Sequence, residues 1–387
     1  MSWPKVKLGD VAPAIPVKNV NLDEDELVWQ LNLDQIESNT GKIVDKVKQP
    51  LSSAGSSTHF FNNEHVLYSK LRPYLNKVVV PDELGIATTE LVPMKPDQKR
   101  LNKEYLAYYL RSKPFVEWVS TQVSGAKMPR VVMSIFWQHE MPLPPLYEQE
   151  RIVSVLGKSN RLRQKREQAI KLADDFLRAT FLEMFGDPIE NPKGWNVKPL
   201  ADQIVHANNG ISRRRKEDTN EGDIVLRLQD VHYSGIAFDK ELSRIKLVDK
   251  EKQIARVEHD DLLFIRVNGN PNYVGRTAVF KSYIEPVYHN DHLIRIKLDN
   301  EYQSDFLCYL INSPFSRKLI AQQIKTSAGQ HTISQDGILK LMFYRPPIEL
   351  QEKFINIKNK IESIFYRKDK HEDLFASISN KLIHSIK

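Results

Sequence analysis

Two long stretches of the chain place apolar residues at the spacing of a helix that buries one face. In the first stretch the apolar positions are Ile152, Val155, Leu162, Ala169, Ala173 and Phe176. In the second stretch they are Ile357, Ile361, Ile364, Phe375, Ile378 and Leu382. Charged residues fill most of the positions between them. This spacing, about 3.5 residues per turn, predicts two long amphipathic helices. It favours their mutual pairing as a coiled coil over separate packing of each helix on its own domain.

Both stretches begin with the same motif, a pair of prolines followed by acidic and amide side chains. Residues 144–152 read PPLYEQERI, and residues 346–354 read PPIELQEKF. The similarity extends upstream, where residues 105–108 (YLAY) match residues 306–309 (FLCY). A repeat of this length is too long for a solenoid unit. The sequence therefore predicts two copies of one domain, each of which leads into a long helix.

Within each copy, short apolar runs bounded by turn residues predict strands, and a longer apolar segment that stops before a proline predicts a helix. In the first copy we expect strands at 26–33, 66–69 and 77–80, and a helix over 102–112. In the second copy we expect strands at 224–228, 262–265 and 277–280, and a helix over 303–312. Each copy is therefore predicted to be a mixed α/β domain.

These patterns divide the chain into two domains and two helices. The first domain is expected over 1–143, its helix over 144–187, the second domain over 188–345 and its helix over 346–387. Gly186 followed by Pro188 is a typical end for the first helix.

Composition and charge narrow the functional classes only a little. The chain has 56 Lys and Arg against 49 Asp and Glu, a net charge of +7. This excess permits an anionic partner such as nucleic acid but does not require one. No apolar run approaches the roughly 18 residues of a membrane span, and the first residues lack a signal-peptide core. We therefore expect a cytoplasmic protein that has no membrane partner.

The sequence lacks the motifs that carry most enzymatic chemistry. It has no phosphate-binding glycine loop, no dinucleotide fingerprint, no nucleophile elbow, no HExxH pair, no adenine-methyltransferase motif and no nuclease-type acidic cluster. His289 and His292 lie close together but lack a third ligand, so a loop or strand-edge role is favoured over a metal site. We expect neither catalytic nor metal-binding residues, and the pattern favours a binding protein.

Basic and amide side chains gather in the loops of both copies. Arginine can bind guanine through two donors, asparagine and glutamine can bind adenine, and lysine mostly contacts phosphate. Each run taken alone could be a solvated loop, but runs at matching positions in both copies favour a shared binding role. The candidate DNA-binding residues are Lys70, Arg72, Lys127, Arg130, Arg213, Arg214, Arg215, Arg227, Arg266, Asn268, Arg276, Gln330 and His331.

The proline motif also carries a family resemblance. Residues 144–152, the helix that runs to residues 181–188 (FLEMFGDP) and the second copy from 346 together resemble the specificity (S) subunit of Type I restriction-modification systems, the HsdS family. The resemblance covers essentially the whole chain. The second copy departs from it slightly, with Glu349-Leu350-Gln351 in place of the Glu-Gln pair and Ile348 at the leucine position.

This resemblance implies two target recognition domains joined by an antiparallel coiled coil with approximate two-fold symmetry. Each domain would recognise one half of a bipartite double-stranded DNA site in the major groove. The coil would set the spacer between the halves and dock two methyltransferase (M) subunits. Its contact residues would be Ile152, Val155, Leu162, Phe176, Ile357, Ile361, Ile364, Phe375 and Ile378.

The resemblance further implies that the chain carries no cofactor and no catalytic residue of its own. S-adenosylmethionine, Mg²⁺ and ATP are expected on the methyltransferase and restriction (R) subunits. The alternatives are a metal-dependent nuclease with an unrecognised site, a symmetric protein scaffold that ignores DNA, and the specificity subunit of a related Type II system.

Overall fold

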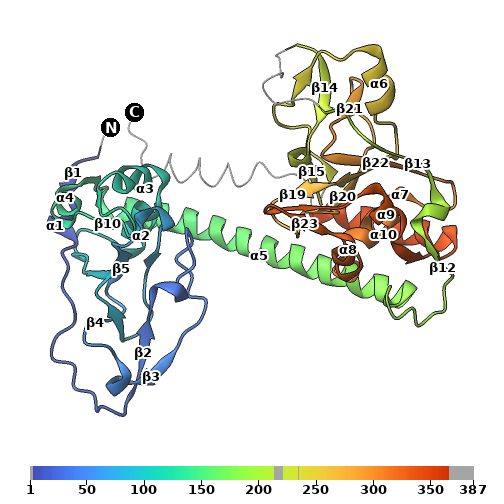
Figure 1. The fold of residues 1–387 in the computed structure, drawn as a ribbon. Helices are drawn as coiled ribbons and strands as arrows, with labels where there is room; N and C mark the ends of the chain where they lie inside the picture. The colour runs from blue at the N-terminus through green and yellow to red at the C-terminus, as the bar shows by residue number, and fades with distance from the viewer. Residues whose placement is uncertain (1–2, 213–220, 234, 366–387) are drawn as a thin grey trace. The chain divides into compact units, whose positions relative to one another are not determined.

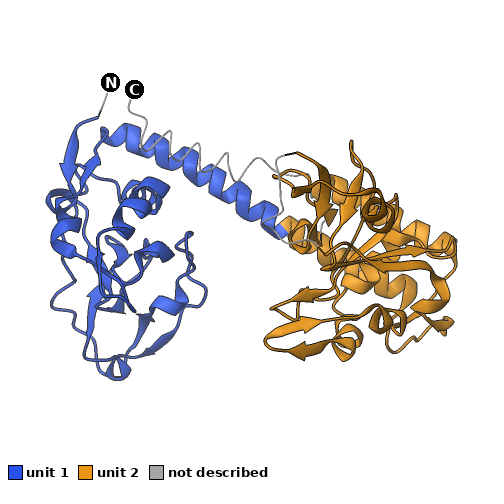
Figure 2. Ribbon diagram, turned by 45° about the horizontal axis from the view of Figure 1, so that its top comes forward, with its two compact units in different colours: residues 1–168, 368–387 blue, residues 169–367 orange. Residues whose placement is uncertain are grey.

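The computed structural model describes residues 3–212, 221–233 and 235–365. These residues form two compact units, residues 3–168 and residues 169–365 (Figure 2). The long helix α5 (Leu146–Phe185) begins in unit 1 and ends in unit 2. Each unit therefore includes a part of this helix, and each has its own hydrophobic core.

Unit 1 consists of small sheets, and α2 packs against the sheet that contains β5 and β6 (Figure 1). Its strands are β1 (Lys5–Lys7), β2 (Leu27–Leu31), β3 (Lys48–Pro50), β4 (Thr58–Phe61), β5 (Val66–Ser69), β6 (Val78–Val79), β7 (Gly85–Thr88), β8 (Leu91–Met94), β9 (Val123–Ser124), β10 (Arg130–Val131) and β11 (Glu140–Pro142). Its helices are α1 (Leu8–Val11), α2 (Lys103–Arg111), α3 (Lys113–Ser120), α4 (Met133–Gln138) and the start of α5. One sheet has the order β3-β2-β7-β4, another has the order β6-β5-β8, and β1 pairs with β11.

Unit 2 repeats this plan with longer strands and additional elements. Its strands are β12 (Val197–Pro199), β13 (Ile204–Asn209), β14 (Asp223–Leu226), β15 (Val231–His232), β16 (Gly235–Ile236), β17 (Arg244–Ile245), β18 (Leu262–Ile265), β19 (Val267–Asn268), β20 (Thr277–Val279), β21 (Val287–His289), β22 (Leu293–Leu298), β23 (Lys325–Ser327), β24 (Gln330–Thr332) and β25 (Met342–Tyr344). Its helices are the end of α5, α6 (Asp249–Ala255), α7 (Ser304–Asn312), α8 (Arg317–Gln323), α9 (Gln335–Leu339) and α10 (Ile348–Phe365). Its larger sheets have the orders β13-β22-β18-β20, β17-β14-β21 and β19-β24-β23.

The two units have the same topology, which confirms the duplication predicted from the sequence. The antiparallel pair β1–β11 corresponds to β12–β25, and the parallel pair β2–β7 corresponds to β14–β21. The sheet order β6-β5-β8 corresponds to β20-β18-β22. The helices α2, α3 and α4 likewise correspond in chain order to α7, α8 and α9. Each half is a mixed α/β unit, as its sequence predicts.

The central strands β5 and β18 match the predicted ranges because they are apolar on both faces. Every residue of both strands is buried. A strand that is paired on both sides and packed on both faces has no solvated face. Its sequence therefore does not alternate between apolar and polar residues. The predicted helices also form, with Asn102 accepting a hydrogen bond from the N–H of Tyr105 at the start of α2. Both helices end before their prolines, α2 at Arg111 and α7 at Asn312, and Pro114 lies in the first turn of the next helix α3.

A buried glutamine fixes the start of the exit helix in each unit. In unit 1, Gln149 accepts the N–H of Asn102 through Oε1 at 2.8 Å. Its Nε2 donates to the carbonyl oxygens of Arg100 at 2.8 Å and Pro144 at 2.7 Å. The Gln149 residue is fully buried. One amide side chain thus joins the proline pair, the segment before α2 and the helix α5.

The equivalent Gln351 makes the same three bonds in unit 2. Its Oε1 accepts the N–H of Gln303 at 3.0 Å, and its Nε2 donates to the carbonyl oxygens of Pro346 at 2.8 Å and Glu301 at 3.4 Å. Gln351 is fully buried as well. In each unit the glutamine of the repeated motif therefore connects the proline pair, the preceding segment and the exit helix, a role that the sequence pattern did not assign to it.

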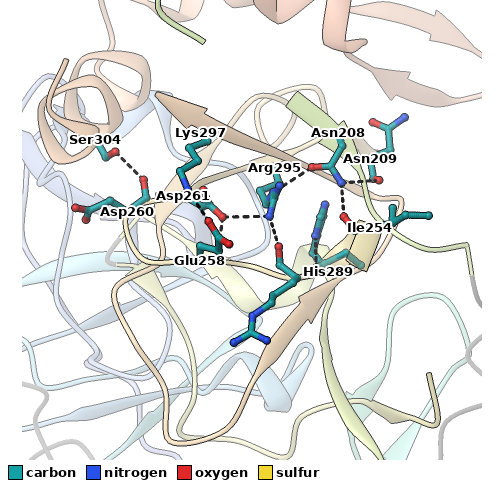
Figure 3. A network of polar contacts seen from close by, with 12 residues as sticks. Asn208, Asn209, Ile254, Glu258, Asp260, Asp261, His289, Arg295, Lys297 and Ser304 are labelled. Carbon is teal, nitrogen blue, oxygen red and sulfur yellow. Dashed lines mark hydrogen bonds and ion pairs between the residues drawn. The ribbon is translucent and has the colours of Figure 1, made fainter. Parts of the chain in front are cut away.

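A second buried polar network lies in unit 2 between β13, β22 and the segment after α6 (Figure 3). Arg295 donates through Nε to Asn208 Oδ1 at 3.0 Å and through Nη1 to the carbonyl of Arg256. Its Nη1 is also 3.6 Å from Asp261 Oδ2. Burial raises the pKa of the Asp261 carboxyl, although Arg295 acts in the opposite direction.

His289 belongs to the same network and is fully buried at the end of β21. Its Nδ1 lies 2.8 Å from the carbonyl oxygen of Ala255. Burial lowers the pKa of His289 to about 4, so the ring is neutral at pH 7. This is the structural role that the sequence favoured for His289 over metal binding.

Helix α5 buries a face that lies one position from the predicted stripe. Ile152 is fully buried, as expected, but Val155, Leu162 and Phe176 are 37, 69 and 56% exposed. Ala173 of the predicted stripe is also buried, and the buried side further includes Leu156, Leu177, Phe181 and Phe185. In unit 1 the buried face continues from Ile152 to Leu156, four residues later. Because an α-helix has about 3.6 residues per turn, a residue four positions on lies closer to the same face than a residue three positions on.

The second predicted helix is only partly within the described residues. In α10, Ile357 and Ile361 are half-buried and Ile364 is exposed. Phe375 and Ile378 lie outside the described residues. The coiled-coil pairing of the two helices therefore stays a prediction.

The hydrogen bonds of Gln149 predict that its replacement destabilises unit 1. We expect Gln149→Leu to lower the free energy of unfolding of unit 1 by about 2–4 kcal/mol, because it leaves the N–H of Asn102 and two carbonyl oxygens without partners. Urea unfolding followed by tryptophan fluorescence measures it, since Trp3, Trp29, Trp118 and Trp137 belong to unit 1. The control is the exposed Gln138→Leu. Equal unfolding midpoints for Gln149→Leu and the control would contradict this role.

The lowered pKa of His289 predicts that unit 2 loses stability in mild acid. The unfolded chain takes up a proton near pH 6.5, whereas the folded chain does so near pH 4. Stability is therefore full above pH 6.5 and falls by up to about 3 kcal/mol as the pH drops to 4. Hydrogen exchange of peptides from β21, corrected for intrinsic rates, measures this loss. His289→Gln should remove most of this dependence of stability on pH, and the exposed His206→Gln should leave it unchanged. The same dependence on pH in both variants would contradict the role of His289.

Candidate nucleic-acid interface

In unit 1, the loop after β5 lies against the hairpin formed by β9 and β10. The N–H of Arg72 donates to the carbonyl of Pro129 at 2.8 Å, and the N–H of Val131 donates to the carbonyl of Lys70 at 2.9 Å. Leu71 and Arg130 form a β-bridge between the two segments. The two loops that the sequence offered as separate candidates therefore form one surface, here called surface 1 (residues 70–74 and 124–130).

Surface 1 carries four of the candidate cations. Arg72, Lys127 and Arg130 are exposed, and Lys70 is half-buried. Arg130 also donates through Nε to both carboxylate oxygens of Glu90, at 3.0 and 3.2 Å. An ion pair this exposed contributes little to stability but does restrict the orientation of the guanidinium. Surface 1 thus presents cationic donors around a single carboxylate.

In unit 2, the equivalent segments meet in the same way. Strand β19 follows β18 and pairs with β24, which places Val267 opposite Thr332 and Asn268 opposite His331. The N–H of Ile333 donates to the carbonyl of Arg266 at 2.9 Å. The loop 266–276 and the hairpin 325–332 therefore form surface 2, at the position that surface 1 occupies in unit 1.

Surface 1 carries cations, whereas surface 2 also carries amide and imidazole groups beside its cations. Asn268 and His331 are half-buried, and Gln330 is exposed. His331 Nδ1 lies 2.9 Å from Thr326 Oγ1 across the hairpin. Arg266 is partly used inside the unit, because its Nη1 donates to the carbonyl of Asp291 at 2.9 Å. The two units thus share one backbone arrangement and present different hydrogen-bonding groups.

The remaining candidate residues lie elsewhere or have other contacts. Arg227 follows β14, where its N–H donates to Asp230 Oδ2 at 2.7 Å and its Nε donates to Ser243 Oγ at 2.8 Å. This arginine therefore has a structural role in the β14 sheet. Arg213, Arg214 and Arg215 lie outside the described residues.

Arg276 ends the loop of surface 2 and has two aromatic neighbours that the sequence candidates omitted. Its guanidinium lies over the rings of Tyr233 and Tyr273. Tyr273 belongs to the same loop, so its proximity in sequence could have indicated the contact. Tyr233 lies in the β15–β16 turn, and no sequence pattern links it to Arg276. Glu90 was also missed, because a lone acidic residue carries no signal by itself.

Within 3–212, 221–233 and 235–365, no group of three or more His, Cys, Asp and Glu side chains could hold a metal ion. None of the helices described is long and apolar enough to cross a membrane.

Known proteins resemble the chain in both sequence and fold. Residues 2–172 match the family described as Type I restriction modification DNA specificity domain. The chain is 29% identical over 280 residues to the Type I restriction enzyme StySPI specificity subunit of Salmonella potsdam, an alignment that covers 69% of this chain and 59% of that protein. It is 22% identical over 282 residues to the Type I restriction enzyme EcoKI specificity subunit of Escherichia coli K12, covering 69% and 60%. The alignments thus span less than two thirds of either relative.

The solved structure of a Type I restriction-modification S subunit from M. genitalium has the same fold. It aligns with a TM-score of 0.61 at 15% identity and covers 100% of this chain and 97% of that one. At this identity the likeness shows the fold alone, but it extends over both units, whereas the family match covers residues 2–172. Residues 2–172 therefore match a Type I restriction modification DNA specificity domain, and the chain is similar to the specificity subunits of Type I restriction enzymes.

Proposed function

We propose that the chain is the DNA-specificity subunit of a Type I restriction-modification complex and that each unit recognises one half of a split double-stranded DNA site. The observation that carries the proposal is the pair of equivalent surfaces. Surface 1 and surface 2 have the same backbone arrangement but present different side chains. Duplicated scaffolds with unlike surfaces suit two unlike half-sites.

The chemistry of both surfaces fits DNA. Flexible cations such as Lys127 contact phosphates, which fixes the protein on the duplex without reading its sequence. Arginine, asparagine and glutamine side chains can each form paired hydrogen bonds with one base edge in the major groove. Surface 1 therefore favours guanine contacts through Arg72 and Arg130, and surface 2 adds amide groups suited to adenine through Asn268 and Gln330.

On this proposal the chain performs no chemistry itself. Two methyltransferase subunits bind S-adenosylmethionine and methylate adenine, and restriction subunits supply ATP-dependent translocation and Mg²⁺-dependent cleavage. The chain contributes the choice of DNA site and needs no cofactor.

The exit helices are proposed to pair as an antiparallel coiled coil that sets the spacer and docks the methyltransferase subunits. Val155, Leu162 and Phe176 on α5 are exposed apolar residues and are the proposed contacts. Exposed apolar side chains in a row on a helix are typical of a surface that is covered in an assembly. The glutamine bonds support the proposal, because they fix the first turn of each helix on its own unit.

The direct test is methylation of split DNA sites. With its methyltransferase subunits the chain should direct methylation to one bipartite sequence, and the subunits without the chain should methylate none. Replacing residues 196–343 with the second recognition domain of a relative should change one half-site and leave the other intact. Methylation or Mg²⁺-dependent cleavage by the chain alone would contradict the non-catalytic assignment.

A change on the exposed face of α5 tests the helix proposal. We expect Leu162→Asp to weaken binding of the methyltransferase subunits or the preference for one spacer length by at least about tenfold, since it places a charge in an apolar contact. Unit 1 should keep its unfolding midpoint, because Leu162 is 69% exposed. Analytical ultracentrifugation and a series of spacer lengths measure these effects, with Leu162→Met as the control. If Leu162→Asp assembles and prefers spacer lengths as the control does, this face of α5 is not the contact.

A further inference from the structure

The guanidinium of Arg276 contacts the rings of two exposed tyrosines. It lies 4.1 Å from the centroid of the Tyr233 ring and 3.8 Å from that of Tyr273. The two tyrosines are 52 and 42% exposed. The guanidinium is planar in itself, and ring contacts of this kind restrict rotation about the last bonds of the side chain. The plane of the side chain is therefore set before any ligand arrives.

A third contact fixes one edge of the same group. Arg276 donates through Nε to the carbonyl oxygen of Asn272 at 3.1 Å. With the two ring contacts made and this edge occupied, the two terminal nitrogens Nη1 and Nη2 remain as a parallel pair of donors. Such a pair matches two acceptors that lie in one plane.

The loop that carries these contacts is held rigidly. Arg317 on α8 donates through Nη2 to the carbonyl oxygens of Pro271 at 3.1 Å and Val274 at 3.0 Å. Gly275 has a φ of +77°, and a Cβ there would lie 2.6 Å from Ile320 Cγ2, so only glycine fits. Loop 266–276 is thus tied to α8 at its base.

The charges around Arg276 favour a ligand that presents hydrogen-bond acceptors. Neither Arg276 nor Arg317 has an ion pair with a carboxylate among the described residues. The Nη1 atom of Arg317 is buried and has no hydrogen-bond partner there. Two neighbouring guanidinium groups without a carboxylate favour the approach of acceptor atoms.

The equivalent position in unit 1 has a different role. The N–H of Ser69 donates to the carbonyl of Lys77, as that of Ile265 does to Arg276, so Lys77 and Arg276 correspond. Lys77 turns inward and donates through Nζ to the carbonyl of Leu33 at 2.6 Å. The stacked arginine is therefore a feature of unit 2 alone.

We propose that Arg276, held by its contacts with Tyr233 and Tyr273, recognises a guanine in the half-site of unit 2, an inference that rests on the proposed DNA-specificity function. Guanine presents O6 and N7 as two coplanar acceptors in the major groove. A phosphate accepts hydrogen bonds from many directions and gains little from a fixed plane, whereas a base edge accepts only in its own plane. Arg276 contacts the base, and the two tyrosines are positioning residues.

The test uses the full chain with its methyltransferase subunits. The preferred split site is first selected from a random duplex library, and each guanine is then replaced by 7-deazaguanine, which lacks the N7 acceptor. For the wild-type chain, this replacement at one guanine in the half-site of unit 2 should lower the affinity for DNA. Arg276→Lys keeps the charge but loses the paired donors, and it should reduce the preference for that guanine by about 10- to 100-fold. The other half-site should be unaffected.

Matched variants separate a positioning role from a structural one. Tyr233→Phe and Tyr273→Phe keep the stacked ring and should retain the guanine preference, whereas Tyr273→Leu should lower it without changing preferences elsewhere. Lys250→Ala, on the exposed face of α6, removes a charge and should change no base preference. Equal effects of Tyr273→Phe and Tyr273→Leu would overturn the stacking argument.

The failures of the two proposals are distinguishable. Selection of no split site overturns the proposed function and this inference together. A selected site in which no guanine of one half responds to 7-deazaguanine or to Arg276→Lys overturns the inference alone. Uniform weakening by Arg276→Lys at all sequences, with a reduced salt dependence, overturns it too and identifies a phosphate contact.

Discussion

The hydrogen bonds of one buried amide in each unit fix how the rest of the chain is attached to the exit helices. Gln149 and Gln351 each accept one backbone N–H and donate to two backbone carbonyls. Only a side chain with both an acceptor and two donors satisfies these three groups. A glutamate lacks the donors, and a leucine of similar size lacks both. The amide therefore couples the proline pair, the segment before the following helix and the first turn of the exit helix.

Because that attachment is fixed, other contacts of the scaffold can differ between the units. Near the end of α2, Arg111 donates through Nε and Nη2 to the carbonyl of Val78, at 3.1 and 2.8 Å. At the equivalent end of α7, Asn312 donates to the carbonyl of Thr277 at 2.7 Å and accepts the N–H of that residue. Different side chains thus hold the same strand to the same helix. The surfaces can diverge further still, as the roles of Lys77 and Arg276 illustrate.

Much of the fold and part of the candidate interface could be predicted from the sequence. The strands at 66–69 and 262–265 and the helices before Pro114 and Pro314 follow from apolar runs and proline chemistry, which act locally. The matching loops were also found, because duplication exposes them. The buried face of α5 was placed one position away, since Val155 and Leu156 are both apolar and periodicity alone does not choose between them.

By itself, the sequence determined the duplication, the types of the main elements and the loops that differ between the copies. These depend on residue order and on the local preferences of prolines, glycines and apolar runs. Only the tertiary structure decided that each loop after β5 or β18 meets its distant hairpin, that Arg266 and Arg227 have partners inside the unit, and that Tyr233 stacks on Arg276. Residues far apart in the chain come together through packing, and packing geometry leaves no periodic signal in the order of residues.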